Sequence, residues 1–373
     1  MRFFKFTVFF ILLSYSFNGS TQTLSNKVTI SLLTCGPGNE LYSVYGHTAL
    51  RVHDPLTYTD VVYNYGTFDF DTPNFYLKFV KGDLQYMLST SSYADFIETY
   101  EYFDRDVYEQ VLNLTYTQKQ DIANRLKETL ASEKRFYMYK FIDRNCTTMA
   151  GNDTEAAIAI PISHDVADKG RTYRDILYGY QEGLFFENLG INLIFGYSTD
   201  KTLDKLFLPL QLMEGVSKTN VNGQPLALKT ATIYKSTGSL DKSSLFNNFY
   251  FFAMVLLIVT AFSGKRIVQV SFLVIFGLLG IFFTTVGFYS FHAEISQNYN
   301  ALLINPLYLV LLFFMVKDNT KWVIRIVYIC LASILVYLLV MLNKPHLFMV
   351  LPIVVLAMVT LIRIALKYRN SVQ

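Results

Sequence analysis

The chain has 373 residues, of which 52% are hydrophobic and 16% charged, and its mean hydropathy is +0.30. This length leaves room for two domains, and this composition is too apolar for an ordinary soluble protein. The formal net charge is only +3, and the sequence lacks a Lys/Arg-rich run or a basic patch interleaved with aromatic residues. Nucleic acid is therefore excluded as an expected partner.

The N-terminus has the pattern of a secretory signal. Arg2 and Lys5 form a short basic region, residues 8–13 are apolar, and small or polar residues follow. We expect cleavage between Ser16 and Gln22, so that residues 1–22 are a signal peptide; an uncleaved anchor is the alternative. Such a signal directs the residues that follow it out of the cytoplasm.

Residues 23–242 are expected to form the exported domain. Its strand and helix patterns mix without βαβ regularity, which favours an α+β fold. Residues 27–35 predict a buried strand that ends at the turn-forming sequence GPGN. Residues 47–66 predict two strands around a turn with Pro55 at its second position.

The rest of the exported domain mixes helical and strand patterns. Residues 117–130 predict an amphipathic helix with a capping box formed by Thr117 and Gln120. The aromatic residues 135–141 predict a strand, and the residues after Cys146 predict a further helix. Residues 216–244 are rich in Ser, Thr, Asn and Lys and predict a linker to the C-terminal half.

Residues 243–373 are expected to form a membrane domain. About 20 apolar residues span a bilayer, and five apolar segments follow one another; the third is short and has Pro306 near its start. The five predicted spans are residues 245–264, 267–290, 301–316, 322–342 and 346–366.

The loops between these spans alternate in charge. Basic residues lie after the first, third and fifth spans: Lys265, Arg266, Lys317, Lys321, Lys367 and Arg369. The other two loops, 291–300 and 343–345, contain a single basic residue, Lys344. Because Lys and Arg collect on the cytoplasmic side, we expect the N-terminal domain outside and the C-terminus inside, as the signal also requires.

Cys146 lies in a polar turn that leads into a predicted helix. A thiolate is favoured at a helix N-terminus or beside a histidine, and such a thiolate is a nucleophile. The chain has five histidines: His47, His53, His164, His292 and His346. Of these, His47 follows Gly46 and opens a strand, a placement that can fix an imidazole; a purely structural role is the commoner one for a lone histidine there.

The predicted hairpin places a third group near His47. With a tight loop at residues 54–57, Asn64 lies opposite His47 and points to the same face. The amide could then orient the imidazole. A register slip of one residue would place a tyrosine there instead.

Other readings of the three cysteines stay open. Cys146 could form a disulfide with Cys35 in an oxidising compartment, and Cys330 lies within a predicted span, where packing is the expected role. No Cys or His pair has the spacing of metal ligands, and the sequence has no Gly-rich phosphate loop or serine-nucleophile elbow. Neither a metal nor a cofactor is expected.

Four segments together resemble the Lnb N-terminal periplasmic domain family: SLLTCGPGNELYSVYGHTALRV, VVYNYGTFDFDTPNF, YKFIDRNCTT and DKLFLPLQLM. Its best-known members are the lipoprotein N-acyltransferases of Bacteroidota, in which a multi-span C-terminal half is typical. The resemblance covers nearly the whole mature chain. It implies a circularly permuted papain-like (NlpC-type) fold in which the histidine precedes the cysteine.

The resemblance also implies site residues. The motif GHTALRV would make His47 the base, NCTT would make Cys146 the nucleophile, and the asparagine of NYG, Asn64, would be a third member. Arg144 in DRNC departs from the acidic-Asn-Cys run of many members. The polar loop 288–306 also resembles the family's. Between two spans, polar side chains are by default interfacial residues; the alternative is that four of them contact substrate by holding a phospholipid headgroup: His292, Asn298, Asn300 and Asn305.

The implied reaction is a two-step acyl transfer at a bacterial inner membrane. An acyl chain would pass from a membrane phospholipid to Cys146 as a thioester, and then to the α-amino group of a diacylglyceryl-cysteine lipoprotein. Two rivals remain. The same dyad could hydrolyse its substrate as a membrane-bound cysteine peptidase or peptidoglycan amidase, or the domain could be a disulfide-bonded, non-enzymatic envelope module.

Overall fold

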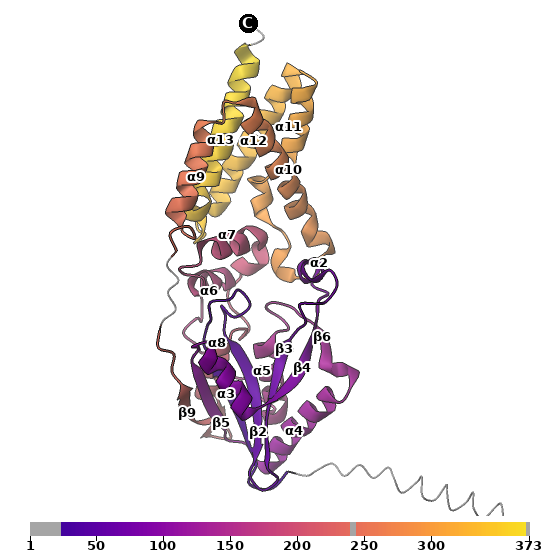
Figure 1. Cartoon of the computed structure of the whole chain (residues 1–373), viewed down its shortest axis with the longest axis vertical. Helices are drawn as coiled ribbons and strands as arrows, with labels where there is room; N and C mark the ends of the chain where they lie inside the picture. The colour runs from indigo at the N-terminus through magenta and orange to yellow at the C-terminus, as the bar shows by residue number, and fades with distance from the viewer. Residues whose placement is uncertain (1–23, 239–243, 371–373) are drawn as a thin grey trace, which may run out of the picture.

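The computed structural model describes residues 24–238 and 244–370, so the predicted signal peptide lies outside the described residues. A sheet domain is followed by a bundle of long helices, and helices α6 (Tyr173–Tyr180) and α7 (Phe185–Ile194) lie between the two (Figure 1). The mixed α+β class of the first half and the helical second half agree with the prediction.

The N-terminal half is built on a seven-stranded antiparallel sheet with the strand order β6-β4-β3-β2-β1-β5-β9. The predicted buried strand and the predicted hairpin form its centre. The strands are β1 Thr29–Cys35, β2 His47–Asp54, β3 Thr59–Thr67, β4 Gln85–Ser92, β5 Val107–Leu112, β6 Phe136–Met138 and β9 Ala227–Tyr234.

Alternate residues of the central strands supply two separate cores, because successive side chains of a strand point to opposite faces. Leu32, Leu50 and Tyr63 face helices α4 (Tyr116–Leu130) and α5 (Cys146–Ile158). Their neighbours Leu33, Ala49 and Val62 face α3 (Tyr93–Tyr102) on the other side. The sheet is therefore covered on both faces (Figure 1).

The shorter elements complete this half: α2 Phe75–Lys81, α8 Pro209–Lys218, the small hairpin of β7 Asn220–Val221 and β8 Gln224–Pro225, and the 3₁₀ turns η2 Glu133–Arg135 and η3 Tyr197–Asp200. The predicted amphipathic helix forms as α4, but its predicted cap was wrong. The capping box is Thr115 with Gln118, two residues earlier. Tyr116 therefore joins the helix, and its hydroxyl donates to the carbonyl of Leu24.

The predicted linker 216–244 was also wrong over much of its length. It contains the end of α8, the β7–β8 hairpin and strand β9, which pairs with β5. Most β9 side chains are exposed because the strand lies at the sheet edge. Such a strand buries no apolar face, so its sequence shows no alternation.

Among the described residues of the C-terminal half, four segments are long and apolar enough to cross a membrane: α10 Arg266–Tyr289, the run Ala293–Val316, α12 Thr320–Met341 and α13 Leu347–Asn370. The run Ala293–Val316 comprises the 3₁₀ turns η4 (Ala293–Ile295) and η5 (Tyr299–Leu302) and helix α11 (Leu307–Val316). The first predicted span appears as α9 Phe249–Ala261, an apolar helix of 13 residues. Thirteen residues rise only about 20 Å, so five spans remain a prediction.

A buried ion pair joins the two halves. Arg174, only 2% exposed, binds Asp200 at 2.7 Å and donates to the backbone carbonyls of Phe195 and Gly196. Lys344, in the loop between α12 and α13, reaches the same carboxylate at 3.1 Å. One buried carboxylate thus neutralises two cations, one from each half of the chain.

Replacing Asp200 with asparagine should destabilise the protein strongly, because buried Arg174 and half-buried Lys344 would lose their counter-charge. Breaking a buried pair costs roughly 3–5 kcal/mol, which should lower the thermal unfolding midpoint in detergent by about 5–10 °C. Asp165→Asn, which removes the partner of exposed Lys169, is the control and should leave the midpoint nearly unchanged. Equal midpoints for both variants would contradict this role of Asp200.

Candidate functional site

His47 is the first residue of β2, and the preceding glycine makes its placement there feasible. Gly46 has φ +85°, and a Cβ on it would lie 2.5 Å from the carbonyl oxygen of Cys35. Only glycine accommodates both the left-handed backbone and this close approach without strain. The sequence Gly-His therefore fixes where the imidazole leaves the end of the sheet.

Asn64 lies beside His47, although the predicted hairpin register was wrong by two residues. The ladder pairs Asp54 with Thr59 and ends with Leu50 opposite Tyr63. The connecting turn is longer than predicted because Asp54 Oδ1 accepts from the N–H of Leu56 and Tyr58 takes φ +54°. A shift of two residues keeps every side chain on its face, so Asn64 still shares the face of His47.

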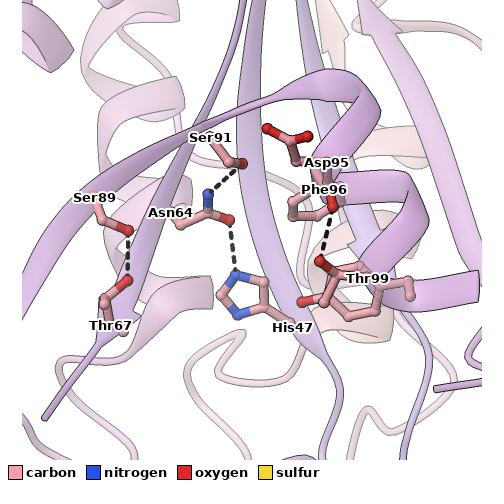
Figure 2. A pocket seen from close by; sticks show the side chains of 10 residues that line it. His47, Asn64, Thr67, Ser89, Ser91, Asp95, Phe96 and Thr99 are labelled. Carbon is pink, nitrogen blue, oxygen red and sulfur yellow. Dashed lines mark hydrogen bonds between the residues drawn. The ribbon is translucent and has the colours of Figure 1, made fainter. Parts of the chain in front are cut away.

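A chain of hydrogen bonds fixes the state of the imidazole (Figure 2). The amide nitrogen of Asn64 donates to Val62 O and Ser91 Oγ, which turns Asn64 Oδ1 towards His47. That oxygen can only accept, so His47 Nε2–H is the donor, across 3.3 Å. The neutral ring then carries an unprotonated Nδ1, which can accept a proton from a neighbouring thiol.

Cys146 is the first residue of helix α5, and Asn145 is the N-cap. Asn145 Oδ1 accepts from the N–H groups of Thr147 and Thr148 at 2.9 and 3.0 Å, while its own N–H donates to Thr148 Oγ1. The amide of Asn145 also donates to the backbone carbonyls of Phe141 and Phe207. The cap therefore holds the thiol rigidly at the positive end of a helix.

The thiol of Cys146 is near the splayed ends of β2 and β3. The ladder ends at Leu50 and Tyr63, and beyond it a Cβ added to Gly66 would lie 3.6 Å from Cys146 Cβ. Thr147 meets Thr48 across 3.1 Å between hydroxyl oxygens. The start of α5 thus packs against the strand end that carries His47.

The electrostatics of the site favour a thiolate. Burial opposes ionisation of Cys146. Once the proton has moved to His47, however, the positive ring attracts the thiolate and donates a hydrogen bond to it, and these effects outweigh burial, with smaller contributions from the Thr48 N–H and the Thr147 hydroxyl. The pKa of the Cys146 thiol is therefore lowered. A half-buried thiol with a lowered pKa has the properties of a nucleophile.

Cys35 has the opposite environment, although it is paired directly with His47 in the β1–β2 ladder. Its side chain is fully buried, and burial raises its pKa far above the ordinary thiol value, against the opposing influences of Arg105 and Tyr100. All three cysteines are free thiols. The predicted alternative of a Cys35–Cys146 disulfide is therefore not present, and Cys330 is buried within α12 as expected.

A pocket of about 310 Å³ opens beside His47 and Asn64. Its other walls come from β3, β4 and α3, and Figure 2 shows polar side chains around the imidazole. Tyr100 lies nearly parallel to the His47 ring, with 6.4 Å between ring centroids. The remaining lining residues are Gly66, Thr67, Ser89, Ser91, Asp95, Phe96 and Thr99.

The four loop residues expected to contact substrate instead bond to the protein itself. His292 Nε2–H donates to Phe79 O, and the amides of Asn298 and Asn300 donate to the carbonyl of Leu193 at the end of α7. Asn305 donates to Ser333 Oγ. These contacts hold the loop between the halves, and a role in substrate binding stays a prediction.

Glu294, from the same loop, supports the segment that carries the nucleophile. This residue is 1% exposed, and its Oε1 accepts from the N–H of Ile142, four residues before Cys146, at 2.8 Å. Its backbone carbonyl also accepts from the N–H of Gly196. The membrane half thereby fixes one end of the loop that leads into α5.

Replacing Glu294 with alanine should lower the activity of the site about tenfold or more, because the Ile142 N–H would lose its buried acceptor. Glutamine retains an acceptor oxygen and should restore most of the activity. For both variants, the alkylation rate of Cys146 and the thermal unfolding midpoint are measured. An alanine variant with wild-type alkylation kinetics would contradict this positioning role.

Sequence reasoning missed two supporting residues, Asn145 and Glu294. Asn145 had a local signal, since an asparagine followed three residues later by threonine fits an N-terminal cap. Glu294 is a polar member of the loop 288–306, but no local signal indicated its partner, which is 152 residues away. Within residues 24–238 and 244–370, no cluster of three His, Cys, Asp or Glu side chains could hold a metal ion.

These features define the class of site that the protein carries. A helix-capped thiol, an imidazole and an orienting amide form a thiol–imidazole site in an α+β domain joined to an apolar helical bundle.

Comparison with known families gives the particular family. Residues 18–174 match the Lnb N-terminal periplasmic domain, and residues 241–373 match the Lnb transmembrane domain. The chain belongs to the Lnb family, a family of membrane proteins that process lipoproteins, and its N-terminal domain is periplasmic. No curated protein and no solved structure matches the chain, so the permuted papain-like relationship stays a prediction.

Proposed function

We propose that this protein is a lipoprotein N-acyltransferase that uses Cys146 as its nucleophile. One observation carries the proposal: the thiol with a lowered pKa at the start of α5, beside a His47 ring whose Nε2–H is held by Asn64. The same arrangement serves acyl transfer and hydrolysis. Four apolar helices attached to this domain favour a substrate that is itself in the bilayer.

In the first step, His47 Nδ1 takes the proton of Cys146, and the thiolate attacks an ester carbonyl of a membrane phospholipid. The backbone N–H of Cys146, in the first turn of α5, would help to stabilise the developing oxyanion. The ester C–O bond then breaks, and the leaving alkoxide takes the proton from His47. The products are a Cys146 thioester and a lysophospholipid.

In the second step, the α-amino group of a diacylglyceryl-cysteine lipoprotein attacks the thioester. His47 removes a proton from the attacking nitrogen, the new C–N bond forms, and the C–S bond breaks. The proton on His47 returns to the Cys146 sulfur. The cycle consumes one ester and forms one amide, and it needs neither a metal nor a cofactor.

We further propose the arrangement in the cell. Residues 1–22 are a signal peptide, residues 23–242 are the periplasmic catalytic domain, and residues 243–373 are the membrane domain. The protein would lie in the inner membrane of a bacterium with its C-terminus in the cytoplasm. The basic loops after α9 and α11 and the basic end of α13 support this orientation. A membrane-anchored domain meets two membrane-anchored substrates at high effective concentration.

The test uses the full chain reconstituted in phospholipid vesicles with a diacylglyceryl-cysteine lipopeptide. The expected products, resolved by mass spectrometry, are the N-acylated lipopeptide and an equal amount of lysophospholipid. Omitting the lipopeptide should stop turnover after one acyl group per protein. Continuous release of free fatty acid, or cleavage of an added peptide or peptidoglycan fragment without amide formation, would identify a hydrolase instead.

A further inference from the structure

Helix α2 and the loop before β2 form an apolar surface that nothing in the described chain covers. Phe75–Lys81 is an apolar helix with no buried residue. Tyr76 and Leu77 are 78% and 72% exposed, and Leu41 and Tyr42 of the neighbouring loop are 57% and 58% exposed. Exposed apolar groups of this size in one place indicate an interaction site. We call Leu41, Tyr42, Phe70, Tyr76 and Leu77 the α2 surface.

The α2 surface is attached to the outer end of a membrane-spanning helix. Ser290 Oγ donates to Val80 O at 2.8 Å, and the N–H of Phe291 donates to Lys81 O at 2.8 Å. His292 Nε2–H donates to Phe79 O. Figure 1 shows α2 directly beside the end of α10. These bonds fix α2 at the depth where α10 leaves the bilayer.

Apolar side chains continue from α2 onto α10 itself. Phe288, Tyr289 and Phe291 at the end of α10 are also exposed, with Phe288 at 87%. Aromatic side chains are enriched at the level of the lipid headgroups, where one part of the ring is apolar and the other meets water. The α2 surface is therefore continuous with the lipid-facing surface of the membrane half.

A path of aromatic contacts leads from this surface to the core against which Cys146 packs. Phe68, like Cys146, packs against that core, which includes Tyr86, and the centroids of the Phe68 and Tyr86 rings are 5.0 Å apart. From Phe68, ring centroids are 4.8 Å apart to Phe70, 5.1 Å from Phe70 to Phe75, and 5.4 Å from Phe75 to Tyr76. An acyl chain leaving the bilayer at Tyr76 would thus meet apolar side chains up to the core beside Cys146.

We propose that the α2 surface inserts into the outer leaflet and receives the acyl chain of the donor phospholipid. The occupant is a bilayer lipid, and the surface sets where an ester carbonyl reaches Cys146. This inference rests on the proposed acyl transfer, and it adds a binding site to that reaction.

The first test measures insertion and needs no catalysis. Trp322 is the only tryptophan in the chain, so Trp322→Phe gives a silent background. In this Trp322→Phe background, Leu77→Trp reports on α2. Leu56→Trp is the matched control, since Leu56 is 63% exposed in the β2–β3 turn at the far end of the domain (Figure 1). Vesicles of phosphatidylethanolamine and phosphatidylglycerol brominated in the acyl chains should quench the first tryptophan only. Equal quenching of both, or none at position 77, would overturn the proposal.

The second test separates lipid entry from chemistry. Tyr76→Ser/Leu77→Ser should lower thioester formation on Cys146 from vesicle phospholipid about tenfold or more. With a short-chain phosphatidylcholine present as monomers, the rate should match wild type. The control is Leu56→Ser/Tyr58→Ser, which removes the same two side-chain types elsewhere. If Tyr76→Ser/Leu77→Ser lost thioester formation with both donors, or with neither, the α2 proposal would be overturned. If the wild type formed no thioester, the proposed function itself would be contradicted.

Discussion

Cys146→Ser is expected to reduce lipoprotein N-acylation by a factor on the order of 10⁴ or more. Serine retains the shape and the hydrogen bonds of the cap, but its hydroxyl does not ionise beside His47 as the thiol does. The effect should therefore appear in the chemical step and leave the fold intact. Mass spectrometry of lipoproteins from cells that carry only the variant measures the loss directly.

Cys35→Ala is the matched control, because Cys35 lies in the same domain and directly opposite His47. Its fully buried thiol, whose pKa burial raises, should not be needed for the reaction. This variant should still form an acyl-thioester that hydroxylamine releases. N-acylated lipoproteins in the Cys146→Ser strain, or an adduct trapped on Cys35, would rule out the assignment of the nucleophile.

His47→Ala should move the pH dependence of Cys146 alkylation to higher pH. In the wild type, the imidazole lowers the pKa of the thiol, so thiolate is present below the ordinary thiol pKa. Without His47, the effect of burial remains and raises the pKa. At neutral pH, each pKa unit of this rise should slow alkylation by iodoacetamide about tenfold.

Asn64→Ala should give an intermediate result, since the imidazole would remain but lose the acceptor of its Nε2–H. His53→Ala, a histidine further along the same strand, is the control and should keep the wild-type profile. The alkylation rate of Cys146 is measured between pH 5 and 10, and the lipoprotein acylation rate is measured for the same variants. A wild-type profile in His47→Ala would remove the imidazole from the mechanism.

The sequence predicted those parts of the fold in which local pattern and burial coincide. The strands ending at Cys35 and beginning at His47 and the helix after Cys146 are buried, so their hydrophobic patterns are clear. His47 is the best-placed histidine from the sequence pattern, but its assignment as the base for Cys146 came more from the family resemblance, because 99 residues separate them. Local pattern carries no signal for such a distance.

The errors have physical causes as well. The hairpin register depends on a side-chain bond of Asp54 and on Tyr58 adopting positive φ, and neither follows from residue type alone. Strand β9 is exposed at a sheet edge, so burial does not impose a clear hydrophobic pattern on its sequence. The bond from Ile142 to Glu294 joins two domains, so only the assembled chain contains it.

The bond between Ile142 and Glu294 bears on biosynthesis. Translation produces His47 and Cys146 long before Glu294, and in the proposed topology Glu294 reaches the periplasmic side only after α10 has entered the bilayer. Until then, the N–H of Ile142 in the loop before Cys146 lacks its Glu294 acceptor. Under the proposed function, insertion of α10 would therefore determine when the site is complete, and a chain stalled before α10 would carry the Cys146 thiol without this support.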